Sequence, residues 1–189
     1  MQPAATLTLP PMESNLPAWT TLLGGGVGIT TSLGITLRKL LCDRLAIPPT
    51  YLEQRIQTIL LNSHPVDDLD GILIAEGDTI ALSAAMPGLA GATLRRGGHL
   101  APMRASISRI PTQQAPGARQ SGLIILKLFN LVAKEIGPQI LSGEIWIRGR
   151  DLSYLRSHNI IPQTPAIEAG PDEWVRLEPT ATPSRAHED

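Results

Sequence analysis

The stretch ATLRRGG, residues 92–98, is where residue types and their order suggest a specific chemistry. Two glycines after a basic stretch can form an extended tail that lacks side chains at its end, and a free carboxylate there would be open to activation. Here 91 residues (99–189) follow Gly98. An internal glycine has no free carboxylate, so this chemistry requires cleavage after Gly98. The alternative is a flexible joint, because glycine adopts backbone conformations that other residues avoid.

A second group of candidate residues is acidic. Asp67, Asp68 and Asp70 lie within the five positions that follow Pro65, and three nearby carboxylates can bind a cation or share a proton. Together with His99 they are the groups that an enzyme working at the centre of the chain would use. Aspartates in a turn are more often solvated, which favours a simple surface turn. Cys42 stands beside the apolar stripe of a predicted helix, which favours a buried or partly buried thiol over a nucleophile.

Other catalytic and ligand-binding patterns are missing from the sequence. GGGVG at 24–28 lacks the spacing of a dinucleotide fingerprint, and neither GxSxG, HExxH nor a phosphate-binding GK[ST] occurs. The four histidines and the single cysteine do not have zinc-ligand spacing, and each histidine lies in a turn-like or terminal context: His64, His99, His158 and His187. We therefore predict no catalytic residue, no metal and no cofactor.

The composition limits the partners. The chain has 16 basic and 17 acidic side chains, a net charge of −1, and scattered aromatic residues, which argues against nucleic-acid binding. With 42% hydrophobic residues it can bury a core, yet no stretch has the length of a membrane span. The N-terminus lacks the pattern of a secretory signal, and one cysteine cannot form an internal disulfide. A cytoplasmic protein that does not enter membranes is expected.

Proline- and glycine-rich segments divide the chain into two ordered parts. We predict a disordered arm at 1–17, a first domain at 18–91, a joint at 92–121, a small second α+β part at 122–178 and a disordered tail at 179–189.

In the first part we expect a hairpin formed by Trp19–Leu23 and Val27–Thr31, then a helix from Thr36 that Pro48 and Pro49 end. Leucines at i, i+3, i+4 and i+8 form the apolar stripe of this helix: Leu37, Leu40, Leu41 and Leu45. Thr50 and Glu53 have the spacing of a capping box, which predicts a helical turn at Tyr51–Arg55 with Thr50 as its cap. Two strands and a shorter strand complete the part: Ile56–Leu61, Thr79–Leu82 and Ile72–Ile74.

In the second part, LIILKLFNLVAKEIG (123–137) predicts a largely buried helix, because its polar residues Lys127, Asn130 and Lys134 form only a narrow stripe. Residues 143–149 alternate as a strand, with Ile145 and Ile147 on a buried face that the helix around Leu128 should cover. A short helix at Leu152–Arg156, capped by Asp151, and a last strand at Trp174–Leu177 follow. The fold class is α+β, a mixed sheet with one packing helix followed by a small second part.

LLNSHPVDDLDGILIAEGDTIALSAAMPG resembles the β-grasp sulfur carriers, such as the small subunit of molybdopterin synthase and the thiamine sulfur carrier, over roughly residues 26–91. In order, the resemblance rests on Leu61-Asn62, on Pro65 to Asp68 and on the Gly77-Asp78 turn that leads into the last strand. It implies a β-grasp, ubiquitin-like fold. Those carriers end on Gly-Gly. The resemblance therefore also implies a carrier tail that ends at the internal pair Gly97-Gly98 and consists of Leu94, Arg95, Arg96, Gly97 and Gly98.

Three functions remain open. The first is a non-catalytic β-grasp module that binds a protein partner. The second is a sulfur carrier or ubiquitin-like modifier released by cleavage after Gly98, with an adenylating enzyme or a protease as partner. The third is an enzyme with a site at the junction of the two parts. We favour the first, and we expect Leu94 to Gly98 to be an exposed joint in a protein that stays full length.

Overall fold

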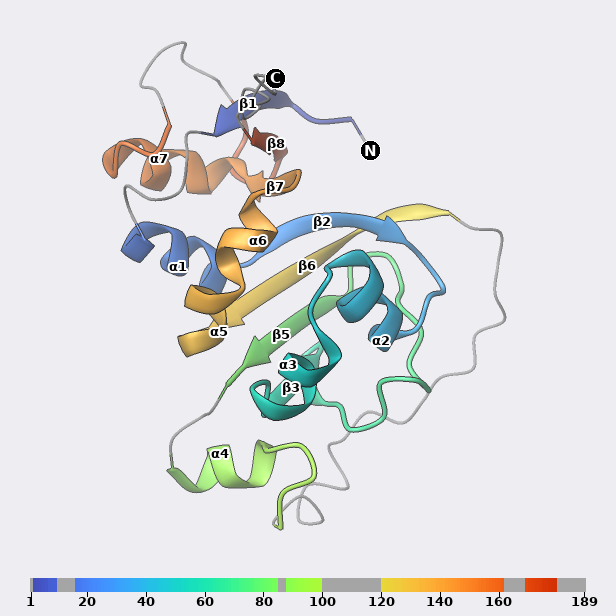
Figure 1. Ribbon diagram of the computed structural model, residues 1–189. Coiled ribbons are helices and arrows are strands. Elements are labelled where there is room, and N and C mark those ends of the chain that lie inside the picture. Colours follow the sequence, from blue (N-terminus) through green and yellow to red (C-terminus); the bar gives the residue numbers. More distant parts are fainter. Residues whose placement is uncertain (1, 10–15, 85–87, 100–119, 162–168, 180–189) are drawn as a thin grey trace, which may run out of the picture.

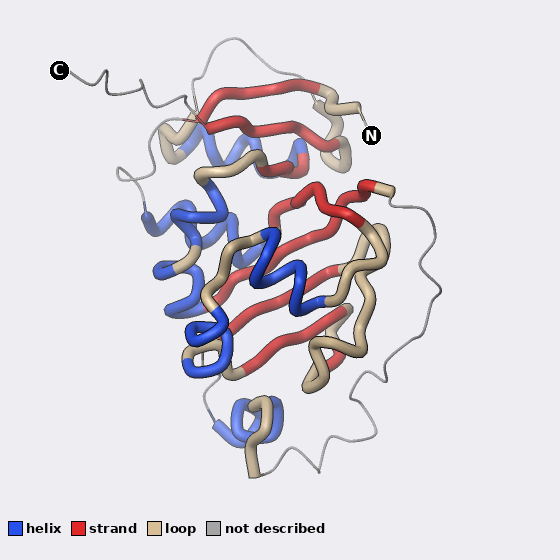
Figure 2. The backbone as a smooth tube through the Cα atoms, turned by 45° about the vertical axis from the view of Figure 1, so that its right-hand side comes forward, coloured by secondary structure: helices blue, strands red, loops and turns tan. Residues whose placement is uncertain are grey.

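A mixed sheet of eight strands organises the described part of the chain, residues 2–9, 16–84, 88–99, 120–161 and 169–179 of this computed structural model (Figures 1 and 2). The sheet order is β1-β8-β7-β2-β6-β5-β3-β4. The strands are β1 (Ala5–Leu9), β2 (Val27–Ser32), β3 (Thr58–Leu61), β4 (His64–Pro65), β5 (Thr79–Ser83), β6 (Ser121–Phe129), β7 (Ile145–Arg148) and β8 (Trp174–Pro179). The helices are α1 (Leu16–Gly25), α2 (Leu37–Lys39), the π-helical turn η2 (Leu40–Arg44), α3 (Pro49–Gln54), α4 (Gly88–Leu94), α5 (Asn130–Glu135), α6 (Gly137–Leu141) and α7 (Gly149–Ser157).

The predicted α+β class is confirmed, but the sheet is larger than expected and extends through both predicted parts. Strand β6 lies between β2 and β5, antiparallel to the first and parallel to the second. The hydrophobic core likewise contains residues from either side of the joint, such as Leu41 and Leu126. The described residues form no helix long and apolar enough to span a bilayer.

The apolar segment predicted as a buried helix is instead the central strand β6. Ile124, Leu126 and Leu128 are fully buried, whereas Ile125 and Lys127 between them are half-buried. This period of two is that of a strand. A strand between two others, with apolar residues on both faces, has a nearly continuous hydrophobic sequence that resembles a buried helix. Helix α5 begins only at Asn130, whose φ is +55°.

The predicted N-terminal hairpin is also wrong in its first half. Residues 16–25 form helix α1, and only Val27–Ser32 is a strand. Trp19, Leu22 and Leu23 have the helical spacing i, i+3 and i+4, and all three are buried. Proline is well tolerated in the first turn of a helix, and Pro17 stands there. The glycines at 24–26 therefore end a helix, with φ of +113° at Gly26.

The first residues of the predicted disordered arm form strand β1. It pairs in parallel with β8, from Ala5 opposite Val175 to Leu9 opposite Pro179. Ala5 and Leu7 are half-buried, whereas Thr6 and Thr8 are exposed, which is the alternation of an edge strand over a core. Residues 10–15, 100–119 and 180–189 lie outside the described residues. They include most of the predicted joint at 92–121 and most of the predicted tail at 179–189.

The leucine-striped helix is confirmed. Thr36 caps α2 by accepting a hydrogen bond from the Lys39 amide through its hydroxyl oxygen, at 3.3 Å. The apolar stripe is buried, with exposed fractions from 0% to 6%: Leu37, Leu40, Leu41 and Leu45. Helix α2 and the turn η2 pack this stripe across one face of the sheet (Figures 1 and 2).

The regular structure ends earlier than the two prolines suggested. It stops at Leu45, and Ala46 follows with a φ of +51°. Helix α3 then begins at Pro49, without the predicted side-chain cap from Thr50.

The remaining elements follow the prediction with three exceptions. Helix α7 begins at Gly149 rather than at Leu152, so Asp151 lies in its first turn and is not its cap. Strands β3, β5, β7 and β8 lie where expected, and both Ile145 and Ile147 are fully buried. The short strand predicted at Ile72–Ile74 is only an isolated bridge between Leu73 and Thr36. The helix expected around Leu128 cannot cover the isoleucines of β7, because Leu128 belongs to β6.

A close approach at Gly28 joins β7 to β2. The two strands share a single registered pair, Gly28 opposite Trp146. A Cβ atom at Gly28 would lie 2.9 Å from the Cβ of Trp146 and 3.1 Å from a Leu123 methyl carbon. The sheet can continue from β2 to β7 because this position carries no side chain.

Candidate functional site

The ATLRRGG stretch is wound rather than extended. Helix α4 ends at Leu94, and the Gly98 amide donates a hydrogen bond to the Arg95 carbonyl oxygen at 3.1 Å. Gly97 has a φ of +61°, a conformation that suits glycine. The stretch thus closes a helix with a tight turn, which is not the extended tail that an activating enzyme would thread.

Arg96 fastens this turn to the rest of the protein. Its amide donates to the Gln57 carbonyl at 2.7 Å, and its guanidinium donates to the Leu52 carbonyl at 3.0 Å. Burial lowers the pKa of Arg96, and the nearby positive charge of Arg38 lowers it further.

The expected exposed joint is therefore only partly exposed. Arg95 and Gly97 face solvent, whereas Leu94, Arg96 and Gly98 are half-buried.

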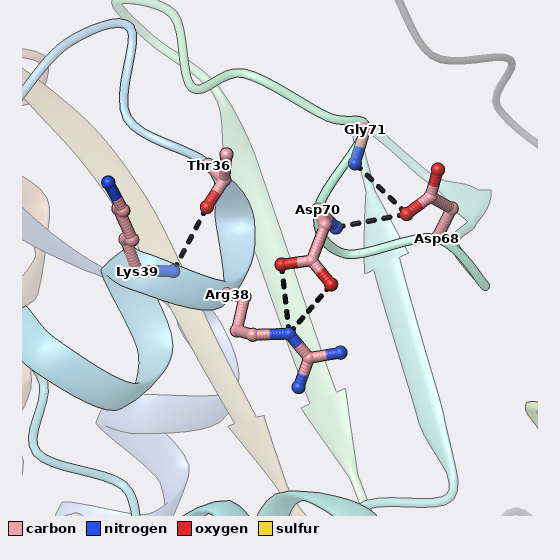
Figure 3. A network of polar contacts seen from close by, with 6 residues as sticks. All are labelled: Thr36, Arg38, Lys39, Asp68, Asp70 and Gly71. Carbon is pink, nitrogen blue, oxygen red and sulfur yellow. Dashed lines mark hydrogen bonds and ion pairs between the residues drawn. The ribbon is translucent and has the colours of Figure 1, made fainter.

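The three aspartates do not converge on a common point. Asp68 accepts hydrogen bonds from the Asp70 and Gly71 amides, at 3.0 and 2.9 Å, and so shapes its own turn (Figure 3). Asp70 accepts from Nε of Arg38 at 2.8–2.9 Å, so its charge is balanced. These contacts give Asp68 and Asp70 structural roles, and they support the surface-turn interpretation over an acid–base site.

The remaining sequence candidates also have ordinary surroundings. His64, His99 and His158 are exposed, and His187 lies outside the described residues. Burial raises the pKa of the half-buried Cys42 thiol, although Arg38 opposes this shift, so the reactive thiolate is disfavoured. Across the described ranges, no group of three histidine, cysteine or acidic side chains could hold a metal ion.

A polar pair, buried Asp78 and half-buried Asn62, holds the turn before β5, and the sequence did not identify the two residues as a unit. Asp78 is only 5% exposed and accepts hydrogen bonds from the Asn62 side-chain amide at 2.7 Å and from the Ala75 amide at 2.8 Å. The side-chain oxygen Oδ1 of Asn62 in turn accepts a hydrogen bond from the Thr79 amide at 2.8 Å. Asn62 and Asp78 are two of the residues on which the β-grasp resemblance rests, and their role here is to fix a turn.

A cavity of about 200 Å³ lies at the junction of the two predicted parts. Strand β2, the end of η2, helix α6 and the turn before β7 form its walls: Ile29, Arg44, Leu45, Ala46, Gln139, Ile140, Ser142, Gly143 and Glu144. The sequence carries no signal for this cavity, because its walls come from segments about a hundred residues apart.

The two edges of the sheet differ in how open they are to another strand. The β4 edge has two residues, one of them Pro65, which has no amide hydrogen to donate. The β1 edge has five residues, ATLTL, without a charge or a proline. Within the described residues β1 pairs only with β8, so its other side offers backbone groups.

Comparison of the chain with family models, with curated proteins and with solved structures gave no match, so the geometry described above is the basis for assigning a function.

Proposed function

We propose that this protein is a non-catalytic interaction module whose protein partner adds an extended strand to β1. The observation that carries the proposal is the contrast between the sheet edges. Proteins usually protect edge strands with charges, prolines, bulges or short length, because an open edge pairs with other chains. The β4 edge is protected in this way, and the five uncharged residues of β1 are not.

The chemistry of β1 defines the partner. Strand addition draws its affinity from backbone hydrogen bonds and its specificity from alternate side chains. Thr6 and Thr8 are exposed, and their side chains are small, uncharged and favourable in strands. The matching segment is therefore an extended, uncharged stretch of another protein, rich in β-branched residues.

Lysine substitutions at the exposed threonines test this proposal. Thr6→Lys together with Thr8→Lys places charges beside the edge while leaving the half-buried residues of β1 intact. Ser153→Lys, at an exposed position of α7, is the matched control. Proteins captured from the native host by the tagged chain are identified by mass spectrometry, and binding is then repeated with the purified partner.

The expected result is one partner that binds the unmodified chain and the Ser153→Lys control, and that loses at least about tenfold in affinity for the double variant. Equal binding to all three chains would contradict strand addition at β1.

The carrier hypothesis is the weaker alternative. Release of a carrier at Gly98 would remove β6, which lies between β2 and β5 in the sheet. The residues before the cut are also held, because Arg96 bonds to Leu52 and Gln57. We therefore expect the intact mass of the protein from its native host to be that of the full-length chain. A dominant species that ends at Gly98, and that Gly98→Ala abolishes, would make the carrier hypothesis the stronger one.

We further propose that β2 to β6, with the stripe of α2 and η2, form a β-grasp-like unit. This is supported by the parallel central pair β5 and β6, by their antiparallel outer neighbours and by the helix on one face. Strand β6 comes from beyond residue 91, so the unit needs a segment that the resemblance did not include. A fragment ending at Gly98 is expected to unfold, which circular dichroism can measure.

An enzyme at the junction has less support. A cavity does lie there, but its polar lining residues do not include a histidine or a cysteine, and the predicted acidic residues and His99 are not among them. We keep the cytoplasm as the proposed location, because a lone thiol suits a reducing compartment. Fractionation of the native host would test it.

A further inference from the structure

We propose that the cavity at the junction binds a small monocarboxylate, with the carboxylate on Arg44 and a compact apolar group against the floor. Three apolar side chains form this floor, and each is at most 6% exposed: Ile29, Leu45 and Ile140. The rim is polar and exposed, and it carries Arg44, Gln139, Ser142 and Glu144. Small-molecule sites combine an apolar lining with a few placed polar groups in the same way.

Arg44 supplies the positive charge of the site. One of its terminal nitrogens donates to the Thr30 carbonyl at 3.2 Å, and Arg44 makes no ion pair within the part of the chain that the structure describes. A guanidinium has five N–H donors in a planar fork that matches a carboxylate, so several donors remain for a ligand.

Glu144, the acidic residue on the rim, has its own partners. One carboxylate oxygen accepts from the Trp146 indole at 3.2 Å, and the other lies 3.6 Å from the Arg176 guanidinium. Arg176 also pairs with Glu178 at 2.8 Å, so these contacts offset the negative charge of Glu144 only in part. Arg44 is the basic side chain of the rim, and it is the group that would hold an anionic ligand.

The backbone beside Arg44 has two features that are frequent at functional sites. The π-helical turn η2 ends on a hydrogen bond from the Leu45 amide to the Leu40 carbonyl at 2.9 Å. Ala46 follows with a φ of +51°, which is strained for a residue with a side chain.

The Gln139 side-chain amide donates to the Leu45 carbonyl at 2.5 Å and fastens the α6 wall to this turn. This bond ties two walls of the cavity together.

The size of the cavity limits the ligand. An apolar cavity of roughly 150 Å³ holds one benzene molecule. At about 200 Å³, this cavity has room for a benzene-sized group and a carboxylate. Benzoate is therefore a suitable probe, and benzamide is its neutral counterpart of nearly the same shape.

The test is a titration of the full chain with benzoate, in which the chemical shifts of the backbone amides are monitored by NMR. We expect saturable shifts at residues 44–46 and 139–144, and binding of benzamide weaker by at least about tenfold, as the loss of a charged hydrogen bond implies. Arg44→Gln should weaken benzoate binding by a similar factor without affecting benzamide. Lys39→Gln removes an exposed charge away from the cavity and should leave both affinities unchanged.

Three results would overturn the proposal. One is the absence of saturable shifts up to about 10 mM benzoate. The second is equal affinity for benzoate and benzamide, and the third is benzoate binding that Arg44→Gln leaves intact. Because Arg44 is exposed, its substitution is not expected to unfold the protein, and the far-UV circular dichroism of each variant verifies this.

Discussion

Gly28→Ala is expected to destabilise the protein through a single added methyl group. The new Cβ would lie 2.9 Å from the Cβ of Trp146 and 3.1–3.2 Å from the two methyl carbons of Leu123. Carbon atoms attract each other best at about 3.5–4.0 Å, so β7 or the Leu123 side chain would have to move by roughly half an ångström. Overpacking of this kind typically costs about 1–3 kcal/mol.

One favourable effect reduces that cost. Alanine restricts the unfolded chain more than glycine and so stabilises by about 0.4–1 kcal/mol where its conformation is allowed. The φ of Gly28 is not in the left-handed region, so the backbone itself permits alanine. We expect a net loss of about 1–2 kcal/mol in the free energy of unfolding. For a chain of this size the midpoint of thermal unfolding should fall by roughly 2–8 °C.

Urea and thermal unfolding followed by circular dichroism measure this change. Gly25→Ala is the matched control, because a Cβ at this exposed position meets no atom within 4 Å. It should leave stability unchanged or raise it by up to about 1 kcal/mol. A neutral or stabilising Gly28→Ala would refute the close approach of β7 to β2, and with it the single sheet.

Three further predictions concern the core, a linked tyrosine and the ATLRRGG turn. Leu41→Ala removes a fully buried side chain and should cost about 2–5 kcal/mol in urea unfolding; a change below a few tenths would remove this helix from the core. Burial, together with the hydrogen bond to Glu135 at 2.5 Å, raises the pKa of Tyr51 to about 12 from 10.0. The contribution of the neutral Tyr51 hydroxyl to stability is therefore complete below pH 10 and is lost as the pH rises through about 12. An ultraviolet titration of Tyr51 should find a lower pKa in the Glu135→Gln variant. Arg96→Ala removes the bond to the Leu52 carbonyl and should speed amide hydrogen exchange in α4, whereas Arg95→Ala, at an exposed position, should change it much less.

Local patterns predicted those elements whose two sides differ in polarity. The leucine stripe from Leu37 to Leu45 identified a helix because only one of its faces is apolar. Strand β6 lacks that contrast, since a strand in the centre of a sheet contacts neighbours on both sides and has apolar residues on both faces. The spacing of Lys127, Asn130 and Lys134 then suggested a helix with a narrow polar stripe. That prediction was wrong for residues 123–129, and helix α5 covers only residues 130–135. Strand β1 was missed because its partner β8 lies about 170 residues further along the chain.

The candidate sites show the same limit. The Asp68 turn and the half-buried Cys42 agree with what their local sequence indicated. The anchoring of Arg96 depends on Leu52 and Gln57, and the cavity depends on Arg44 meeting residues 139–144. Such contacts arise only when distant segments pack, so a single sequence does not reveal them.

Hydrogen exchange at residues 5–9, with and without the protein partner, tests the central claim most directly. If the partner adds a strand to β1, the amides on the free side of the strand become hydrogen-bonded, and their exchange should slow by at least about tenfold in the complex. Residues of α7, such as Ser153, should exchange equally fast in both states. Unchanged exchange in β1, with protection appearing elsewhere on the surface, would contradict the account.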